Sequence, residues 1–405
     1  MHTLFVTMMA YPPIGGEFLR NWQNINLMRQ FGPVGVFSML DRPNQYVPDG
    51  ALAFWQHYDT SMSPGPVSER VGQWLRQRGV SYYCAYRRSA AQQLHQILAE
   101  FQPQVVVIEQ VWLYYYLSVV QPYPGQIIFD NHNIEAPLYA RTKCAGQSVR
   151  SQARRAIQVP QLDRHERTLV TQAHQTWVCS QLDAQQLTAL YGAPEKTVVV
   201  PNAIQLEDYN RVRQQRRGRT PAAAPKILYM GNFGYIPNAE AAQILIGEIY
   251  PRLRIQAPDA QLLLVGRCPP SWMQQLARQN PNITVTGEVS DVRPYLATAD
   301  VMVVPLHQGS GTRFKVLEAF SAGCPVISTA KGVEGLNVQD GEHCLVREHP
   351  EEMVAAIGQI SGNPWLAHAL TVKAYEQVLS QYSWTALERV VADAIAQLIP
   401  TLTPV

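Results

Sequence analysis

Residues Gly309 to Thr329, GSGTRFKVLEAFSAGCPVIST, carry the strongest fold signal in this chain. They follow the apolar run 301–306, which has the length and composition of a buried strand. A glycine-rich turn, a helical pattern and a second apolar run from Pro325 come next. Free backbone N–H groups and the helix dipole meet where such a turn enters a helix, and together they form an anion site. The stretch therefore predicts a phosphate-binding turn within an α/β domain.

Three charged side chains follow this turn. Arg313 and Lys315 lie at the expected helix start, where the dipole alone disfavours positive charge. We therefore expect a ligand with more negative charge than the dipole offsets, and a pyrophosphate fits. Glu318 shares a helix face with Lys315, about 4.5 Å further along the axis, where a carboxylate can accept hydrogen bonds from a ribose diol. An ordinary exposed Lys–Glu pair is the alternative explanation of this spacing.

Length and composition restrict the protein class. The 405 residues exceed what one hydrophobic core supports, so two domains are expected. A net charge of +2 gives no argument for nucleic acid as a partner. The six cysteines form no CxxC pair, so neither a disulfide framework nor a zinc site is indicated. We find no signal-peptide pattern and no apolar run approaching about 18 residues, and we expect a cytoplasmic protein.

Apolar runs alternate with helical patterns throughout. The runs of the first half lie at 4–8, 34–40, 105–108, 127–129, 177–179 and 198–200, and those of the second half at 227–230, 262–265, 283–286, 301–306 and 326–328. Continuous Val, Ile and Leu runs are typical of parallel strands covered by helices on both faces. We predict an N-terminal domain at 1–207, a linker at 208–225, a C-terminal domain at 226–380 and an amphipathic final helix at 384–400 that packs on a domain.

Other motifs end strands of the first half. Gly15 and Gly16 close the segment MAYPPIGG after the first strand, where adjacent glycines allow a ligand close to the backbone or simply make a tight turn. The polar cluster 130–135 follows the strand at 127–129, at the sheet edge where open α/β sheets place their sites. His132 in this cluster could orient a sugar hydroxyl, although an isolated histidine is usually structural. The aromatic residues at 112 and 114–116 could line an acceptor cleft or pack in the core.

Several enzyme classes are disfavoured. The turn at 229–234 lacks the GxGxxG pattern, and Phe314 occupies the third glycine position after Gly309 and Gly311, which argues against a nicotinamide dehydrogenase. No HExxH, P-loop or GxSxG pattern occurs. No Asp-x-Asp pair occurs either, which argues against a metal-dependent sugar transferase of the single-domain type. The basic segments 141–167 and 208–225 permit contact with a membrane surface, and solvated segments are the alternative.

Five blocks in this order carry a family resemblance. They are Pro12-Pro13-x-x-Gly15-Gly16, Asp130-x-His132-Asn133-x-Glu135, Val200-Pro201-Asn202, Gly309-x-Gly311-Thr312-Arg313-x-Lys315-x-Leu317-Glu318-Ala319 and Ala322-Gly323-x-Pro325-Val326. The chain thereby resembles the retaining glycosyltransferases of family four, in particular members with GTR-x-K-x-LEA. The resemblance implies the GT-B fold, in which two Rossmann-like, doubly wound α/β domains face a cleft. It also implies that the final helix crosses back onto the N-terminal domain.

The resemblance implies roles for individual residues. His132 would face the transferred sugar, and Arg313 and Lys315 would neutralise the donor pyrophosphate; these three are the expected catalytic residues. Glu318 would hold the ribose hydroxyls, and the backbone around Val289 would bind the base. The remaining expected donor-binding residues are Gly15, Gly16, Gly231, Asn232, Ser310, Gly311 and Thr312.

The sequence departs from the family pattern at two places. Ser310 replaces a glutamate that often lies eight positions before the ribose-binding one. Gly231-Asn232-Phe233 and Pro237-Asn238 replace the usual Arg and Lys after the first strand of the second domain. In the GTR-x-K members, Arg313 and Lys315 would supply that charge.

The expected activity is transfer of a sugar, with retention of the anomer, from a UDP- or GDP-sugar to a glycan or lipid-linked acceptor, as in polysaccharide biosynthesis. Preorganised cations and N–H donors would stabilise the leaving pyrophosphate, so no metal and no further cofactor are expected. The expected location is the cytoplasm, with peripheral contact at the inner face of the membrane as an option. A catalytically inactive sugar-nucleotide sensor and a sugar-nucleotide epimerase on the same architecture are the alternatives. The sequence names neither the base, the sugar nor the acceptor.

Overall fold

The computed structural model describes residues 1–8, 16–40, 50, 52–59, 86–141, 149–219, 224–309 and 313–400. The chain forms two compact units. One consists of Met1–Asn202 together with Glu388–Val405, and the other of Ala203–Leu387. Each unit contains one parallel sheet, as the continuous apolar runs predict.

The first unit is built on a seven-stranded sheet in the order β3-β2-β1-β4-β5-β6-β7, with every neighbouring pair parallel. All residues of β1 and β4 are buried, because helices cover both faces. The strand order reverses between β1 and β4, the position at which open α/β sheets bind ligands. The strands are β1 (Thr3–Thr7), β2 (Val34–Leu40), β3 (Phe54–Asp59), β4 (Val105–Glu109), β5 (Gln126–Asn131), β6 (Gln175–Val178) and β7 (Thr197–Val199).

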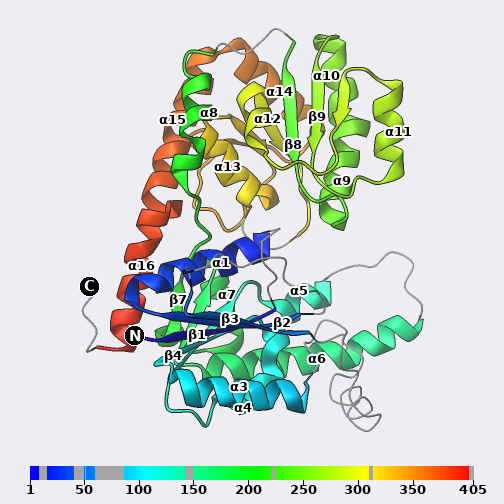
Figure 1. Cartoon of the computed structure of the whole chain (residues 1–405). Helices are drawn as coiled ribbons and strands as arrows, with labels where there is room; N and C mark the ends of the chain where they lie inside the picture. The colour runs from blue at the N-terminus through cyan, green and yellow to red at the C-terminus, as the bar shows by residue number, and fades with distance from the viewer. Residues whose placement is uncertain are drawn as a thin grey trace. The chain divides into compact units, whose positions relative to one another are not determined.

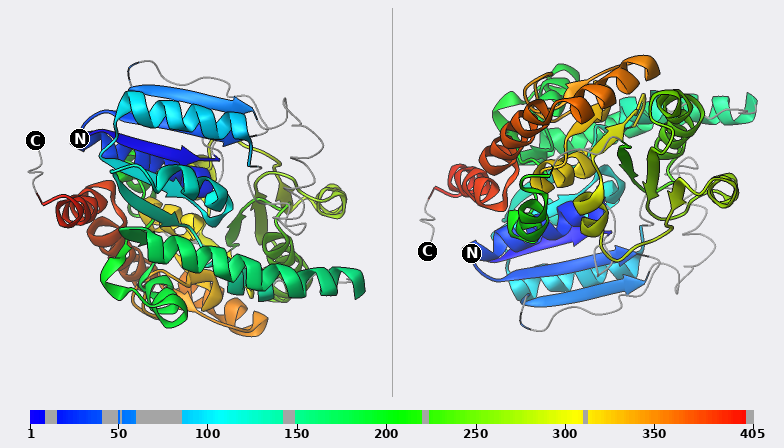
Figure 2. Two further views of the ribbon diagram at one scale, coloured as in Figure 1. Left: turned by 90° about the horizontal axis from the view of Figure 1, so that it is seen from below. Right: turned by 90° about the horizontal axis from the view of Figure 1, so that it is seen from above.

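Helices lie on both faces of this sheet. Figure 1 shows α1 over one face and α3 and α4 over the other, and in the view from below α3 and the long α6 lie on the same face (Figure 2). The helices are α1 (Gly16–Met28), α3 (Arg88–Phe101), α4 (Leu117–Val120), α5 (Glu135–Arg141), α6 (Val149–Gln172) and α7 (Gln181–Tyr191). The end of α16 (Trp384–Leu398) also belongs to this unit, where the Gln175 side chain donates a hydrogen bond of 2.7 Å to the carbonyl of Ala394.

The second unit contains a six-stranded parallel sheet in the order β10-β9-β8-β11-β12-β13. Its strands are β8 (Lys226–Met230), β9 (Gln261–Val265), β10 (Ile283–Val285), β11 (Val301–Val304), β12 (Val326–Ser328) and β13 (Leu345–Val346). Its helices are α8 (Asn210–Arg216), α9 (Ile236–Ile244), α10 (Tyr250–Gln256), α11 (Ser271–Gln279), α12 (Arg293–Thr298), α13 (Phe314–Ala322), α14 (Pro350–Gly362) and α15 (Pro364–Gln377).

The structure differs from the linker expected at 208–225. Residues 210–216 form α8 and pack within the second unit. The guanidinium of Arg216 donates to the carbonyls of Gly323 (2.8 Å) and Leu296 (2.6 Å), near the ends of α13 and α12. Helix C-termini carry unpaired carbonyls and partial negative charge, so arginine stabilises them. Composition alone could not distinguish this packed arginine from a solvated one.

The second basic segment contributes to α6, with Pro160 inside the helix. Its Arg164 and Arg167 are exposed, whereas Leu162 and Glu166 on the other face are completely buried. None of the helices in the described part of the chain is long and apolar enough to span a bilayer.

Candidate functional site

Helix α13 places the charged residues of the Gly309–Thr329 stretch. Its buried face includes Val316, Leu317 and Phe320, which fix the helix against the core beside β12. Arg313 is the N-cap residue, and its side chain makes no capping hydrogen bond. The N–H groups and the dipole at the start of a helix attract an anion, although the N–H of Val316 already donates to the carbonyl of Arg313 at 2.8 Å. The helix ends at Gly323, whose φ of 70° is the left-handed conformation that glycine adopts at low cost.

Lys315 points into a polar pocket of neutral oxygens. Its Nζ donates to Asn238 Oδ1 at 2.8 Å and to the Tyr229 hydroxyl at 3.1 Å, and it lies 4.3 Å from the centre of the Tyr229 ring. Desolvation, together with the positive charge of Arg313, lowers the pKa of Lys315 from 10.5 to about 7. Two cations close together in a desolvated site repel one another, so a bound anion would stabilise both.

Arg313 is the second cation and is 6% exposed. Its Nε and Nη2 lie 3.4 and 3.3 Å from the carbonyl oxygen of Lys331. Desolvation lowers the pKa of its guanidinium, although the carboxylate of Glu334 opposes this effect. A Cβ added to Gly309 would lie 3.6 Å from Nη1 of Arg313, so Gly309 lies close to the guanidinium.

Glu318 lies one turn beyond Lys315. Its Oε1 accepts a hydrogen bond of 2.9 Å from the hydroxyl of Tyr209, which is 8% exposed. Desolvation raises the pKa of Glu318 from 4.5 to about 7, although the Tyr209 hydroxyl and Lys315 both favour its ionised form. The Tyr209 hydroxyl thus holds one oxygen of the carboxyl group, and the second oxygen can accept hydrogen bonds from a ligand.

The turn after β8 orients Lys315 indirectly. Asn238 donates from Nδ2 to the carbonyl of Asn232 at 3.0 Å, which fixes the amide so that its Oδ1 faces Lys315. A Cβ at Gly231 would lie 2.9 Å from the side-chain carbon of Asn238, so any larger residue would displace this amide. Gly231 and Asn232, which sequence analysis assigned to the donor site, therefore position the residue that holds Lys315.

A separate polar cluster lies at the carboxyl end of the first sheet. Asp130, at the end of β5, is completely buried, and its Oδ1 accepts from Nε (3.1 Å) and Nη2 (2.6 Å) of Arg20 on α1. Burial alone would raise the pKa of Asp130, but the charges of Arg20 and His132 and their hydrogen bonds lower it to about 2. Arg20 also donates to the carbonyl of Val200 at 2.7 Å and to Asn202 Oδ1 at 3.0 Å. The cluster thus joins two of the blocks that carry the family resemblance.

His132 is held by two side chains of this cluster. Its Nδ1 lies 2.9 Å from Nε2 of Gln110, and its Nε2 lies 3.2 Å from Oδ2 of Asp130. With Gln110 as the donor, Nδ1 accepts and the Nε2–H group donates to Asp130. His132 is 6% exposed. Gln110 has φ 69° and ψ 151°, a conformation nearly exclusive to glycine, and such strain is concentrated at functional sites.

Glu109, the last residue of β4, adds a second buried carboxyl group to the cluster. Desolvation and the neighbouring Asp130 raise its pKa well above 4.5. Its Oε2 accepts from the Asn21 amide, which also donates to the hydroxyl of Thr7 at 3.1 Å. Burial therefore favours the protonated form of Glu109.

The expected site residues fall into two groups. Arg313, Lys315, Glu318, Gly231 and Asn232 come together in the second unit, and Val289, after β10, belongs to the same unit. His132 lies in the first unit, where Gly16 begins α1. Gly15, Ser310, Gly311 and Thr312 lie outside the described residues. The roles assigned to all of these residues stay predictions.

Sequence reasoning missed three contributors. Tyr209 is separated from Glu318 by 109 positions and Arg20 from Asp130 by 110, so neither contact has a local signal. Asn238 was noted only as a departure from the family pattern. The pattern around Arg20 gave no signal of its burial, because Gln23 and Asn24, its neighbours at helical spacing, are also polar.

Comparisons with known proteins agree with this architecture. The family model described as Glycosyl transferases group 1 matches residues 224–363, about a third of the chain. This segment contains the complete cluster around Lys315 except Tyr209. No curated protein matches the sequence.

Solved structures resemble nearly the whole chain. Sucrose-phosphate synthase from Thermosynechococcus elongatus has a TM-score of 0.74 at 18% identity, over 99% of this chain and 100% of that one. Anabaena HepE in complex with UDP gives 0.71 at 12%, over 98% and 100%. WaaG, a glycosyltransferase involved in lipopolysaccharide biosynthesis, gives 0.67 at 15%, over 96% and 99%. At such identities the likeness concerns the fold, and it confirms the predicted two-domain GT-B architecture.

Proposed function

We propose that this protein is a glycosyltransferase that takes a sugar from a nucleotide-sugar donor. The family model over 224–363 and the GT-B fold support a transferase. Solved structures of the neighbour HepE in complex with UDP and with UDP-glucose add support for the donor. UDP-sugar is therefore our first candidate donor, with GDP-sugar as the second.

The desolvated pair Arg313 and Lys315 carries this proposal. The amino end of α13 supplies N–H donors to the same place, so cations and dipole converge on one anion position. The hydrogen-bond acceptors of Lys315 are the neutral oxygens of Tyr229 and Asn238, which leaves its charge for a ligand. A pyrophosphate supplies the missing negative charge, and Glu318 one turn further could accept from a ribose diol.

The same arrangement suggests how the reaction is accelerated. Breaking the bond between the sugar and the donor leaves negative charge on the pyrophosphate. Arg313, Lys315 and the helix N–H groups stabilise that charge more strongly in the transition state than in the bound donor, which lowers the barrier. These groups fill the role for which other transferases use a divalent cation, so we propose a metal-independent reaction with no further cofactor.

We propose retention of the anomer by substitution on one face of the sugar. The leaving phosphate would take the proton from the acceptor hydroxyl as the new bond forms. His132 would contact the transferred sugar, with Asp130 and Gln110 fixing its ring orientation. The proposed acceptor is a glycan or lipid-linked precursor in polysaccharide or glycoconjugate biosynthesis, used at the cytoplasmic face of a membrane.

Donor binding and turnover test this proposal directly. Calorimetric titration with UDP, GDP and ADP, each with and without EDTA, would identify the base. Turnover of the matching sugar conjugate with a panel of lipid-linked and free glycans would follow. Binding of one nucleotide with an affinity that EDTA does not change supports the metal-free donor site. Proton NMR of the product gives the anomeric configuration. Failure to bind any nucleotide would count against the donor site. An inverted product would count against retention of the anomer.

One observation favours a second candidate, a sugar-nucleotide sensor without turnover. Both ring nitrogens of His132 are engaged by protein side chains, as in a structural histidine. Turnover of the parent protein, and the effect of His132→Ala on turnover and nucleotide affinity, distinguish the two candidates. A transferase would lose turnover and keep its affinity for the nucleotide, whereas a sensor would show no turnover in the parent protein with any acceptor.

A further inference from the structure

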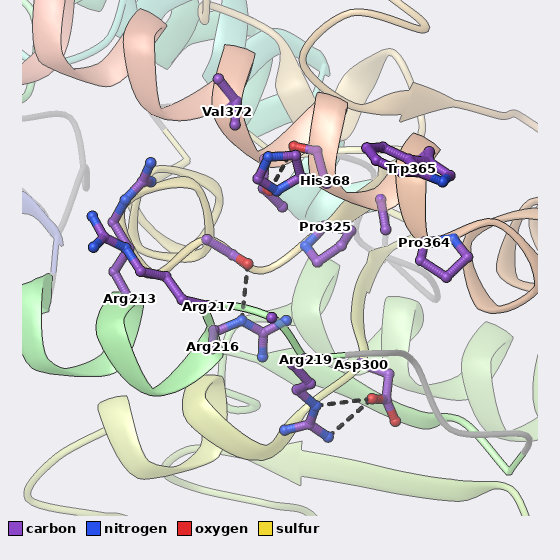
Figure 3. Close-up of a pocket in the computed structure, with 14 residues that line it drawn as sticks. Arg213, Arg216, Arg217, Arg219, Asp300, Pro325, Pro364, Trp365, His368 and Val372 are labelled. Atoms are coloured by element: carbon purple, nitrogen blue, oxygen red, sulfur yellow. Dashed lines mark hydrogen bonds and ion pairs between the residues drawn. The ribbon is translucent and has the colours of Figure 1, made fainter.

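A second basic pocket occurs in the second unit, at the other end of α13 from Lys315. It has a volume of about 530 Å³, within the range of small-molecule sites. Arginines of α8 and the residues after it line one side, and Pro364 and Trp365 at the start of α15 line the other (Figure 3). Gly323, which ends α13, is also part of the wall. The nine residues of α13 span about 13.5 Å, so this pocket is distinct from the site at Arg313 and Lys315.

Two of the four arginines in the pocket have structural partners. Arg216 donates to carbonyls near the ends of α12 and α13. Arg219 forms an ion pair of 2.9 Å with Asp300, the carboxylate of the pocket wall. Asp300 is therefore committed to Arg219 and to the backbone N–H of Lys226, which donates to its Oδ2 at 2.8 Å.

The other two arginines lack an anionic partner among the described residues. The guanidinium of Arg213 lies flat over the ring of Tyr375, 3.5 Å from its centre, and its Nη1 is buried without a hydrogen-bond acceptor. Arg217 is exposed, and no ion pair or side-chain hydrogen bond of it occurs in the described part of the chain. The pKa of Arg213 is lowered by desolvation and further by the positive charge of Arg217, so the two cations are close enough to repel each other.

Two neighbouring cations without an anionic partner are unfavourable unless a ligand supplies negative charge. Arginine pairs suit the oxygens of a phosphate group, which can accept from both guanidinium groups at once. Trp365 is 83% exposed at the rim and presents a large aromatic side chain that packing within the unit does not explain. It could cover a ring or an acyl portion attached to the phosphate.

We propose that this pocket binds a phosphate-bearing ligand, with its phosphate held between Arg213 and Arg217 and its remaining part against Trp365. The ligand is either a soluble phosphoester or the phosphate headgroup of a lipid at a membrane surface. The two sources share the same chemistry at the arginines and differ in what surrounds Trp365. This site is independent of the donor site, because none of its residues belongs to the cluster around Lys315.

Hydrogen exchange followed by mass spectrometry tests the proposal, because it reports on each segment separately. The full chain is compared in buffer, in inorganic pyrophosphate, on phosphatidylcholine vesicles and on phosphatidylcholine vesicles that contain phosphatidic acid, all at matched ionic strength. We expect slower exchange in peptides covering 210–219 and 364–372. Protection by pyrophosphate in solution indicates a soluble phosphoester, whereas protection on phosphatidic acid vesicles alone indicates a lipid.

Arg217→Gln is the informative variant, because this exposed side chain makes no ion pair or hydrogen bond with the described residues that the substitution would remove. The ligand concentration that gives half of the maximal protection at 210–219 should rise by about tenfold or more in this variant, the loss expected for a charge-assisted hydrogen bond. Arg211→Gln is the matched control, since Arg211 is an exposed arginine of the same helix outside the pocket. No protection in any condition would overturn the proposal. So would equal protection in Arg217→Gln, or an equal loss in Arg211→Gln, which would indicate non-specific charge attraction.

Discussion

Replacement of Lys315 by methionine should stabilise the protein without ligand and weaken nucleotide binding. Methionine has a similar length and no charge, and its sulfur packs favourably on aromatic rings such as Tyr229. Its neighbours would not be left unpaired, because the Tyr229 hydroxyl still donates to Asn238 Oδ1 at 2.8 Å. Stabilisation would show that Lys315 is retained for a ligand at a cost to the fold, since functional sites commonly carry such strain.

The magnitude follows from the pKa of Lys315, which is 10.5 in a solvated lysine and about 7 here. A lowered lysine pKa means that the unfolded chain binds more protons between pH 7 and pH 10.5, so stability rises with pH in that window. The resulting penalty on the folded state is about 4 kcal/mol at pH 7 and about 2 kcal/mol at pH 9. The two lost hydrogen bonds offset about 2 kcal/mol of the gain. Lys315→Met should therefore stabilise by about 2 kcal/mol at pH 7 and be nearly neutral at pH 9.

Thermal unfolding at both pH values measures this difference. For a unit of this size, about 2 kcal/mol corresponds to a rise in Tm of roughly 4–8 °C. At pH 7 the same variant should bind UDP roughly 10- to 150-fold more weakly, because a charge-assisted hydrogen bond contributes about 1.5–3 kcal/mol. Lys373→Met is the control, since Lys373 is exposed and forms an ion pair with Glu376 on α15. Equal effects of Lys315→Met at both pH values would refute the desolvated lysine, and unchanged UDP affinity would refute its role at the pyrophosphate.

Four further predictions concern individual groups. UDP binding at pH 8 should take up close to one proton, because an anion restores the charge of Lys315, and calorimetry in buffers of different ionisation enthalpy measures this uptake. Glu318→Gln should weaken UDP but not 2′,3′-dideoxy-UDP, and an equal loss for both ligands would argue against a ribose contact. Asp130→Asn should cost about 3–5 kcal/mol in urea unfolding, since Arg20 would be left buried without its partner. Gln110→Gly should be more stable than Gln110→Ala by about 1–3 kcal/mol, because both lose the contact to His132 and only glycine relieves the backbone strain; the reverse order would exclude that strain.

Much of the fold was predictable because its signals are local. The strands expected at 4–8, 105–108 and 301–306 overlap β1, β4 and β11, whose residues are buried on both faces of their sheets. A continuous apolar run is the pattern that such burial requires. The helix after the glycine turn was also readable, because Leu317 and Phe320 recur at helical spacing and Gly323 ends the helix.

The arginine-rich segment at 208–219 shows where local signals fail. Its charge and its neighbouring prolines are typical of a solvated linker, yet Arg216 bonds the carbonyl at the end of α13. The two carbonyls that Arg216 bonds belong to Leu296 and Gly323, 80 and 107 positions away along the chain. The local sequence around Arg216 does not indicate that these distant carbonyls need a donor. The basic pocket that contains Arg213 and Arg217 follows from the same packing.

The sequence by itself predicted the strands of the two parallel sheets and the cations at the start of α13, because each of these signals lies within a short stretch of the chain. Only the tertiary structure decided the chemical state of those cations. Lys315 is desolvated because β8 and α9 bring Tyr229 and Asn238 against it, and Glu318 is oriented because Tyr209 reaches it from a distant segment. Desolvation and hydrogen bonding depend on what surrounds a group in space, and residues distant along the chain supply those surroundings.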